Sequence, residues 1–124
     1  PNGVGKLDVI STSTMSVAKS GVAIANGYHS LMALESGQLF VGSTGCSNVT
    51  SGCLSIFSTS GSSVVNSAPG TGDVTGLQPN DAKSEMYVIQ GGELVIWDAT
   101  KPAPLDVSKQ IDIVGQATDA KLID

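Results

Sequence analysis

Apolar and polar residues alternate over short stretches of this chain, and no stretch keeps the period of an amphipathic helix. Residues 6–10, 38–42, 85–90 and 93–98 combine this alternation with Val, Ile, Leu and aromatic residues, which is typical of β-strands. Gly, Ser, Asn and Pro separate the strands, and Gln90-Gly91-Gly92-Glu93 predicts a tight hairpin. The pattern predicts an all-β protein of short strands with almost no helix.

One strand motif occurs three times along the chain. It consists of Leu, a β-branched residue two positions later, a large apolar residue and then a polar turn, at residues 6–13, 53–60 and 93–100. Its leucines, Leu7, Leu54 and Leu94, are 47 and then 40 residues apart. A repeat of about 40–45 residues is typical of the four-stranded blade of a β-propeller. The motif therefore predicts repeated propeller blades.

Segments around each motif supply the remaining strands of a blade. Strand-like segments precede and follow the second and third motifs, at 38–42, 85–90, 63–65 and 110–114. Segments richer in small residues stand further upstream, at 28–34, 73–77 and 118–123. Small side chains suit the innermost strand, which is crowded against the centre of a propeller. Lettered a to d from the inside outward, the strands follow the order c-d, a-b-c-d, a-b-c-d, a.

This order divides the chain into a partial blade at 1–26, complete blades at 27–70 and 71–115, and the start of a further blade at 116–124. We expect one β-propeller segment of about two complete blades plus partial strands, as a portion of a larger propeller. Unpaired strand edges are adhesive. We therefore expect either the remaining blades of a longer parent or copies that join strand to strand.

Two short motifs carry a family resemblance. Gly27-Tyr28-His29-Ser30-Leu31-Met32-Ala33-Leu34 resembles the Gly, His and small apolar strand of bacterial YVTN-type propeller repeats, which are related in architecture to the NHL and WD-repeat propellers. Trp97-Asp98 resembles the dipeptide that ends the third strand of a WD repeat. The later units lack the His of the first motif. The resemblance implies a bacterial propeller repeat protein.

Composition narrows the classes of partner. Aromatic residues make up only 4% of the chain, so Val, Ile, Leu and Ala must build most of the core. The net charge of −5, with six Lys and Arg residues in all, opposes a nucleic-acid surface, which needs clustered positive charge. No apolar run reaches the roughly 20 residues of a transmembrane helix. We expect neither a nucleic-acid partner nor a transmembrane segment.

The two cysteines, Cys46 and Cys53, are separated by six residues in a segment of Ser, Asn, Thr and Gly. We expect a disulfide that closes the loop between strands b and c of the first complete blade, where this insertion accounts for the longer spacing of 47. A disulfide points to an oxidising compartment, so we expect a secreted protein, extracellular or periplasmic. Two unrelated thiols, or a metal site, remain the alternatives, although a second pair of Cys or His ligands is missing.

A few side chains are candidates for a site. His29, Asp73 and Asp119 fall on or near the innermost strands, where we expect them to line the central channel. His29 is the only histidine, and the sequence offers it no nucleophile motif. The two carboxylates suit Ca²⁺ or Mg²⁺ but are too few to form a site by themselves. For Phe57 and Trp97 we predict packing between blades.

The sequence thus favours a non-enzymatic binding or scaffolding module of an extracytoplasmic β-propeller protein. Its expected partners are a protein, a second copy bound through strand edges, or the remaining blades of a parent chain. No cofactor, catalytic residue or metal ligand is predicted. One alternative is a fragment of a metal-dependent propeller hydrolase or lactonase, and another is a self-assembling structural subunit that joins through its strand edges.

Overall fold

The computed structural model of the chain describes residues 5–46, 52–60, 64–66, 72–101, 107–111 and 115–123. These residues form ten strands in three antiparallel sheets, without a helix. The strands are β1 (Gly5–Ser11), β2 (Ser16–Ile24), β3 (Tyr28–Glu35), β4 (Gln38–Thr44), β5 (Leu54–Ser58), β6 (Val64–Asn66), β7 (Val74–Asn80), β8 (Glu85–Gln90), β9 (Glu93–Asp98) and β10 (Val107–Ile111). The all-β prediction is confirmed.

Each sheet is a meander in which neighbouring strands are consecutive in the chain. The sheets have the orders β1-β2, β3-β4-β5-β6 and β7-β8-β9-β10. Tight two-residue turns at Ser36-Gly37 and Gly91-Gly92 join β3 to β4 and β8 to β9. All four of these turn residues have positive φ, as a type I′ hairpin requires. The predicted boundary between residues 70 and 71 lies outside the described residues.

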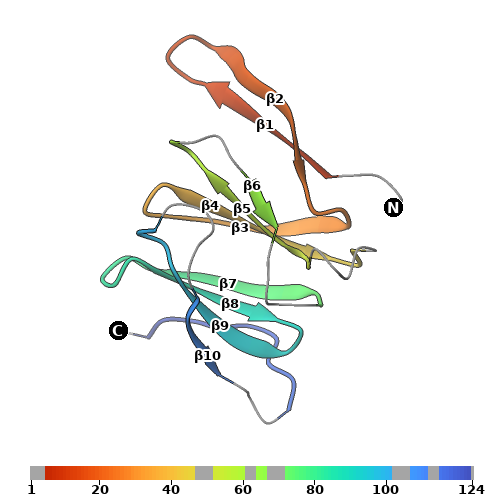
Figure 1. Cartoon of the computed structure of the whole chain (residues 1–124), viewed down its shortest axis with the longest axis vertical. Helices are drawn as coiled ribbons and strands as arrows, with labels where there is room; N and C mark the ends of the chain where they lie inside the picture. The colour runs from red at the N-terminus through yellow and green to blue at the C-terminus, as the bar shows by residue number, and fades with distance from the viewer. Residues whose placement is uncertain are drawn as a thin grey trace.

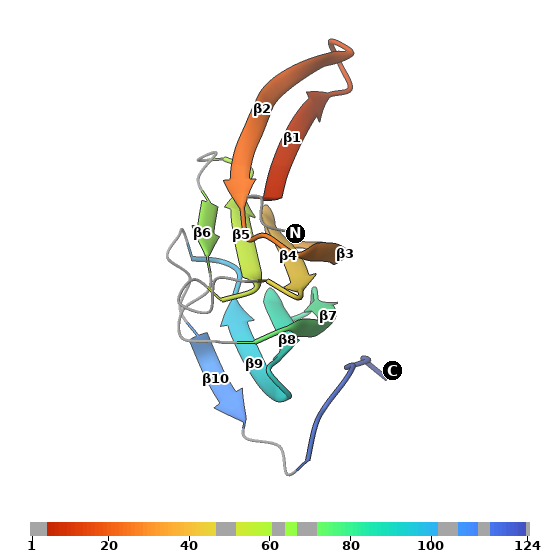
Figure 2. The ribbon, with the colours of Figure 1, turned by 90° about the vertical axis from the view of Figure 1, so that its right-hand side faces the viewer.

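The three sheets are stacked in chain order along the long axis of the molecule, with the β1-β2 hairpin at one end (Figure 1). The first strands of the two four-stranded sheets, β3 and β7, contact each other, and β4 also contacts β7. Figure 2 shows β3, β7 and residues 115–123 along one edge of the stack, with β6 and β10 along the other. Within the described part of the chain, no helix is long and apolar enough to cross a membrane.

The core lies between the two four-stranded sheets. Phe40, Leu54 and Ile56 from the first sheet pack in one buried cluster with residues of the second, including Val88 and Trp97. The sheets approach closely at Gly42, where a methyl group would lie 2.6 Å from Val74 Cγ1. Although aromatic residues are few, Phe40 and Trp97 are the largest fully buried side chains.

The β1-β2 hairpin contacts the opposite face of the β3-β6 sheet. The backbone N–H of Ala25 donates a hydrogen bond of 2.8 Å to Ser55 Oγ, and Ile24 and Ala25 are buried. Along β1, half-buried residues such as Leu7 and Val9 alternate with exposed ones. The hairpin therefore has an inner face, which lies on the sheet, and an outer face in solvent.

Candidate functional site

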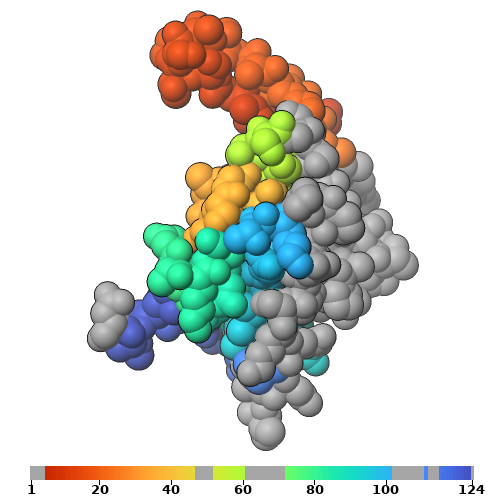
Figure 3. Space-filling view, turned by 60° about the vertical axis from the view of Figure 1, so that its left-hand side comes forward, coloured from red at the N-terminus to blue at the C-terminus, as the bar shows by residue number. Residues whose placement is uncertain are grey.

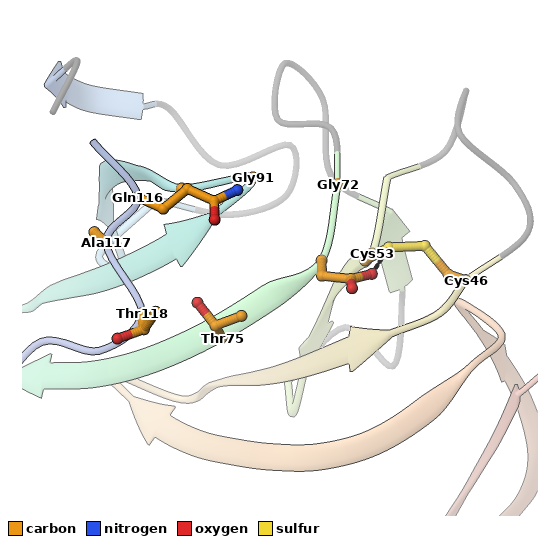
Figure 4. Close-up of a pocket in the computed structure, with 10 residues that line it drawn as sticks. Cys46, Cys53, Gly72, Thr75, Gly91, Gln116, Ala117 and Thr118 are labelled. Carbon is orange, nitrogen blue, oxygen red and sulfur yellow. Dashed lines mark hydrogen bonds between the residues drawn. A yellow bond between two sulfur atoms is a disulfide. The ribbon is translucent and has the colours of Figure 1, made fainter. Parts of the chain in front are cut away.

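A cleft of about 470 Å³ lies at one end of the junction between the two four-stranded sheets. The Cys46–Cys53 disulfide forms one wall, residues 72–73 and Thr75 at the start of β7 form the base, and the Gly91-Gly92 turn with residues 116–118 forms the other wall. Figure 4 shows these segments facing one another. The lining therefore comes from both sheets and from the segment that follows β10.

The disulfide connects Cys46 and Cys53 with a Cα–Cα distance of 5.9 Å. Cys53 is buried, and its carbonyl accepts a hydrogen bond of 2.9 Å from the Ser43 N–H, which fixes this wall to β4. The predicted disulfide is confirmed, and the alternatives of two separate thiols or a cysteine metal site do not hold. A disulfide is compatible with an extracellular protein.

Asp73 connects the two walls of the cleft. Its carboxylate Oδ1 accepts a 2.8 Å hydrogen bond from the N–H of Gly45, next to the disulfide. Its backbone carbonyl accepts a 2.9 Å bond from the N–H of Gly91, in the opposite wall. Nearby, the Gln90 side-chain amide donates to the Gly72 carbonyl at 3.3 Å. Asp73, which the sequence predicted to line the central channel, thus connects the two four-stranded sheets at the cleft.

A β-bulge places Thr75 in the cleft. In the β7-β8 ladder, Val74 pairs with Gln90 and Gly76 pairs with Ile89, so Thr75 is an extra residue without a partner across the strand. Its side chain is exposed and points into the space between the Gly91-Gly92 turn and the disulfide (Figure 4). The bulge therefore supplies a hydroxyl at the base of the site.

Residues 116–118 lie against the Gly91-Gly92 turn. The Ala117 N–H donates to the Gly92 carbonyl at 3.3 Å, and a methyl group at position 92 would lie 3.3 Å from the Gln116 Cγ. The side chain of Gln116 extends toward the cleft (Figure 4). The cleft therefore presents hydroxyl, amide and backbone groups with one carboxylate, which makes it a polar hydrogen-bonding surface.

The structure does not bring His29 or Asp119 into this cleft. The Nε2 of His29 donates a 2.6 Å hydrogen bond to the Ala25 carbonyl, and its ring lies over Gly5. Asp119 lies against Gly76, accepts a 2.8 Å bond from the Ala120 N–H and is 3.6 Å from the Lys121 ammonium. Among the described residues, no group of three or more His, Cys, Asp or Glu side chains could hold a metal ion.

Both residues for which packing was predicted are buried. Trp97 is 2% exposed and belongs to the cluster shared by the two four-stranded sheets, although its indole Nε1–H has no hydrogen-bond partner within the described residues. Phe57 lies outside that cluster. Phe57 lies on the same face of β5 as Ser55. Because Ser55 accepts a hydrogen bond from Ala25, which follows β2, this face lies toward the hairpin.

Sequence reasoning did not single out Thr75, Gln116 or Thr118 as site residues. The available signal was positional, because in an antiparallel meander the turn between the second and third strands lies at the same end as the start of the first strand. The repeat therefore could have placed the Gly91-Gly92 turn beside Asp73 and the segment near residue 116.

Comparison of the chain with protein-family models, curated proteins and solved structures finds no match. The functional argument therefore depends on the geometry of the sheets and of the cleft between them.

Proposed function

We propose that the chain is a non-enzymatic binding module of an extracytoplasmic protein, built from consecutive blades of a β-propeller that resembles the YVTN type. The cleft between its two four-stranded sheets would bind a polar segment of a partner protein. The observation that carries the proposal is the cleft itself, which opens where the two four-stranded sheets meet and is lined from four separate segments.

Three features support the interpretation as propeller blades. Two four-stranded meanders follow one another and pack face to face around a common core. Their first strands lie side by side along one edge of the stack (Figure 2). The β1-β2 hairpin contacts the first meander on its other face, as the outer two strands of a preceding blade would.

The chemistry of the lining fits a peptide. The volume of about 470 Å³ lies within the range of about 300–1,000 Å³ that is usual for ligand pockets. Thr75, Gln116 and Thr118 offer hydroxyl and amide groups that both donate and accept, which matches peptide amides and polar side chains. The Asp73 carboxylate and the net charge of −5 oppose phosphate and other anions.

The disulfide supports an extracytoplasmic location. It lies in the wall of the cleft, and disulfides persist chiefly in oxidising compartments. In such a setting it also fixes Cys46 and Cys53 relative to each other in this wall.

The test is an NMR titration of the ¹⁵N-labelled chain with short peptides of Gly, Ser, Asn and Lys. We expect the amide signals of Gly91, Gly92 and Thr118 to shift. Thr75→Trp, at an exposed position in the base of the cleft, should fill the space and abolish the shifts. Thr12→Trp, at the exposed hairpin turn, is the matched control and should leave them unchanged. An absence of shifts, or shifts that survive Thr75→Trp, would contradict the proposal.

A further inference from the structure

Large apolar side chains are exposed at both ends of the stack. At one end, Ile10 and Val17 of the hairpin are 63% and 60% exposed, and Met32 and Leu34 of β3 are 59% and 58% exposed. At the other end, Ile123 is 93% exposed, and Leu122 precedes it. Exposed apolar residues that gather in this way mark interaction surfaces more often than scattered ones do.

The first surface has two parts, which are the outer face of the hairpin and a notch between β1 and the exposed residues of β3. Ile10 pairs with Val17 across the hairpin, and both project from its outer face. Met32 and Leu34 pair with Val41 and Leu39, on the face of the sheet that lies toward the hairpin. Among the described strands, β1 pairs only with β2, so its other edge borders the notch (Figure 2). We call this surface the head.

The second surface consists of residues 115–123 and the outer face of the β7-β10 sheet, which we call the tail. The Ala117–Gly92 hydrogen bond and the contact of Asp119 with Gly76 fix the start of the segment. Its last residues are exposed, and Figure 3 shows them at the opposite end of the molecule from the hairpin. On the neighbouring sheet, Leu94 and Ile96 are only half-buried.

The internal junction shows how a head and a tail fit together. In the repeat, Ile10 of the head occupies the position of Trp97, and Ile96 of the tail occupies the position of Ile56. Trp97 and Ile56 belong to the one core cluster that joins the two four-stranded sheets. The face that carries Ile10 and the face that carries Ile96 are therefore the repeat equivalents of two faces that already pack together within the chain.

We infer that copies of this chain associate head to tail, with residues 120–123 of one copy in the notch between β1 and β3 of the next. The outer face of the hairpin then packs on the β7-β10 sheet of the first copy. This interaction goes beyond the proposed binding of a peptide in the cleft. It uses two different surfaces of each copy, so it is heterologous and produces rings or open chains rather than closed two-fold dimers.

Charged residues occupy exposed positions on the hairpin, Lys6 and Asp8 on the outer face of β1 and Lys19 on β2, and the Asp8 carboxylate is already partnered. Asp8 lies on the outer face of the hairpin, and its Oδ1 accepts hydrogen bonds of 3.0 Å from Ser20 Oγ and 2.7 Å from the Gly21 N–H. These bonds move with the hairpin when it docks, so the carboxylate keeps them. The exposed edge of β1 can accept a strand from the partner, in the way that β-augmentation extends a sheet.

The test measures the mass of the 124-residue chain by light scattering after size exclusion over a range of concentration. We expect masses that rise with concentration to multiples of 12.5 kDa. Met32→Lys in the head and Leu122→Lys in the tail should each reduce assembly at least tenfold. Ala82→Lys, which adds the same charge at the exposed turn after β7, should assemble like the original chain. Circular dichroism of each variant shows that it folds.

Mixing the two blocked variants gives the decisive result. The head variant keeps an intact tail and the tail variant an intact head, so an equimolar mixture should form one heterodimer of twice the 12.5 kDa chain mass. An interface of head with head or of tail with tail, or non-specific aggregation, would not be restored by mixing. A chain that stays monomeric at every concentration, a head variant that assembles normally, or a mixture without heterodimer would overturn the inference.

Discussion

Gly42→Ala tests how closely the two four-stranded sheets pack. Gly42 lies in β4, between Leu31 and Leu54 in the ladder. Its φ is outside the positive range that favours glycine, so the backbone itself accepts alanine. The new methyl group, however, would lie 2.6 Å from Val74 Cγ1 and 3.0 Å from Val74 Cβ, where ordinary contacts begin at 3.4 Å. The substitution is therefore a steric probe of the junction between β4 and β7.

The cost follows from the lack of room for Val74 to move. Val74 is fully buried, so relieving the contact requires the sheets to separate or its side chain to leave its rotamer. Overpacking of this kind costs about 1–3 kcal/mol. Alanine recovers about 0.5–1 kcal/mol because glycine within a strand loses more backbone entropy on folding. We expect Gly42→Ala to lower the free energy of unfolding by about 1–1.5 kcal/mol.

Urea denaturation measures this loss of stability. It can be followed by the fluorescence of Trp97, the only tryptophan, which lies in the same core cluster as Val74. Val74→Ala removes the atom at 2.6 Å and leaves the contact at 3.0 Å. The double variant Gly42→Ala, Val74→Ala should therefore be more stable than the sum of the single effects by about 1 kcal/mol. A loss below about 0.5 kcal/mol for Gly42→Ala, or additive effects in the cycle, would refute the close packing of the sheets.

Three further predictions concern the disulfide, the core and one carboxylate. Reduction of Cys46–Cys53, or its replacement by two serines, should cost about 2.5 kcal/mol in urea denaturation, as expected for closure of a short loop. Trp97→Ala should cost about 3–5 kcal/mol. Trp97→Phe should stay within about 1 kcal/mol of the original chain by circular dichroism, because it removes an indole N–H that has no partner within the described residues. The pKa of Asp98 is lowered below 3.8, first by the hydrogen bond from the Thr100 hydroxyl and then by the one from the Thr100 N–H. The ionised carboxylate therefore stabilises the folded chain above pH 3.8, and this stabilisation is lost as the pH falls through the folded pKa. Thr100→Ala should raise that pKa toward 3.8 in a ¹³C NMR titration of the carboxyl, and an unchanged pKa would contradict the assignment.

Most of the strands and their order could be predicted because they depend on local information, but the strand expected at 118–123 was wrong, since these residues form no strand. In each meander the partner of a strand is the next strand in the chain, so period-two alternation and turn residues such as Gly91-Gly92 determine the pairing. The disulfide was predictable for the same reason, since Cys46 and Cys53 flank one loop. Local patterns do not determine how the sheets pack on one another, which also depends on close approaches such as that of Val74 to Gly42.

Position in the repeat does not determine which of His29, Asp73 and Asp119 lies in the cleft. His29 stands on β3, Asp73 directly precedes β7, and Asp119 lies in the segment after β10, which forms no strand; of the three, Asp73 lines the cleft. His29 instead turns toward the Ala25 carbonyl under the hairpin, and Asp119 turns toward Gly76. Each orientation depends on which segment of the neighbouring sheet lies opposite, and this is a contact between residues far apart in the sequence.

A β-bulge interrupts the first strand of each four-stranded meander. In β3 the extra residue is Ser30, between the pairs His29–Ser43 and Leu31–Gly42, and in β7 it is Thr75 at the corresponding place. A bulge reverses the alternation of faces along its strand, so residues before it point differently from what the period-two pattern indicates. The same irregularity in both meanders indicates that it belongs to the repeat. It is also what exposes the Thr75 hydroxyl at the base of the cleft, so the site arises where the strand departs from the regular pattern that made the fold predictable.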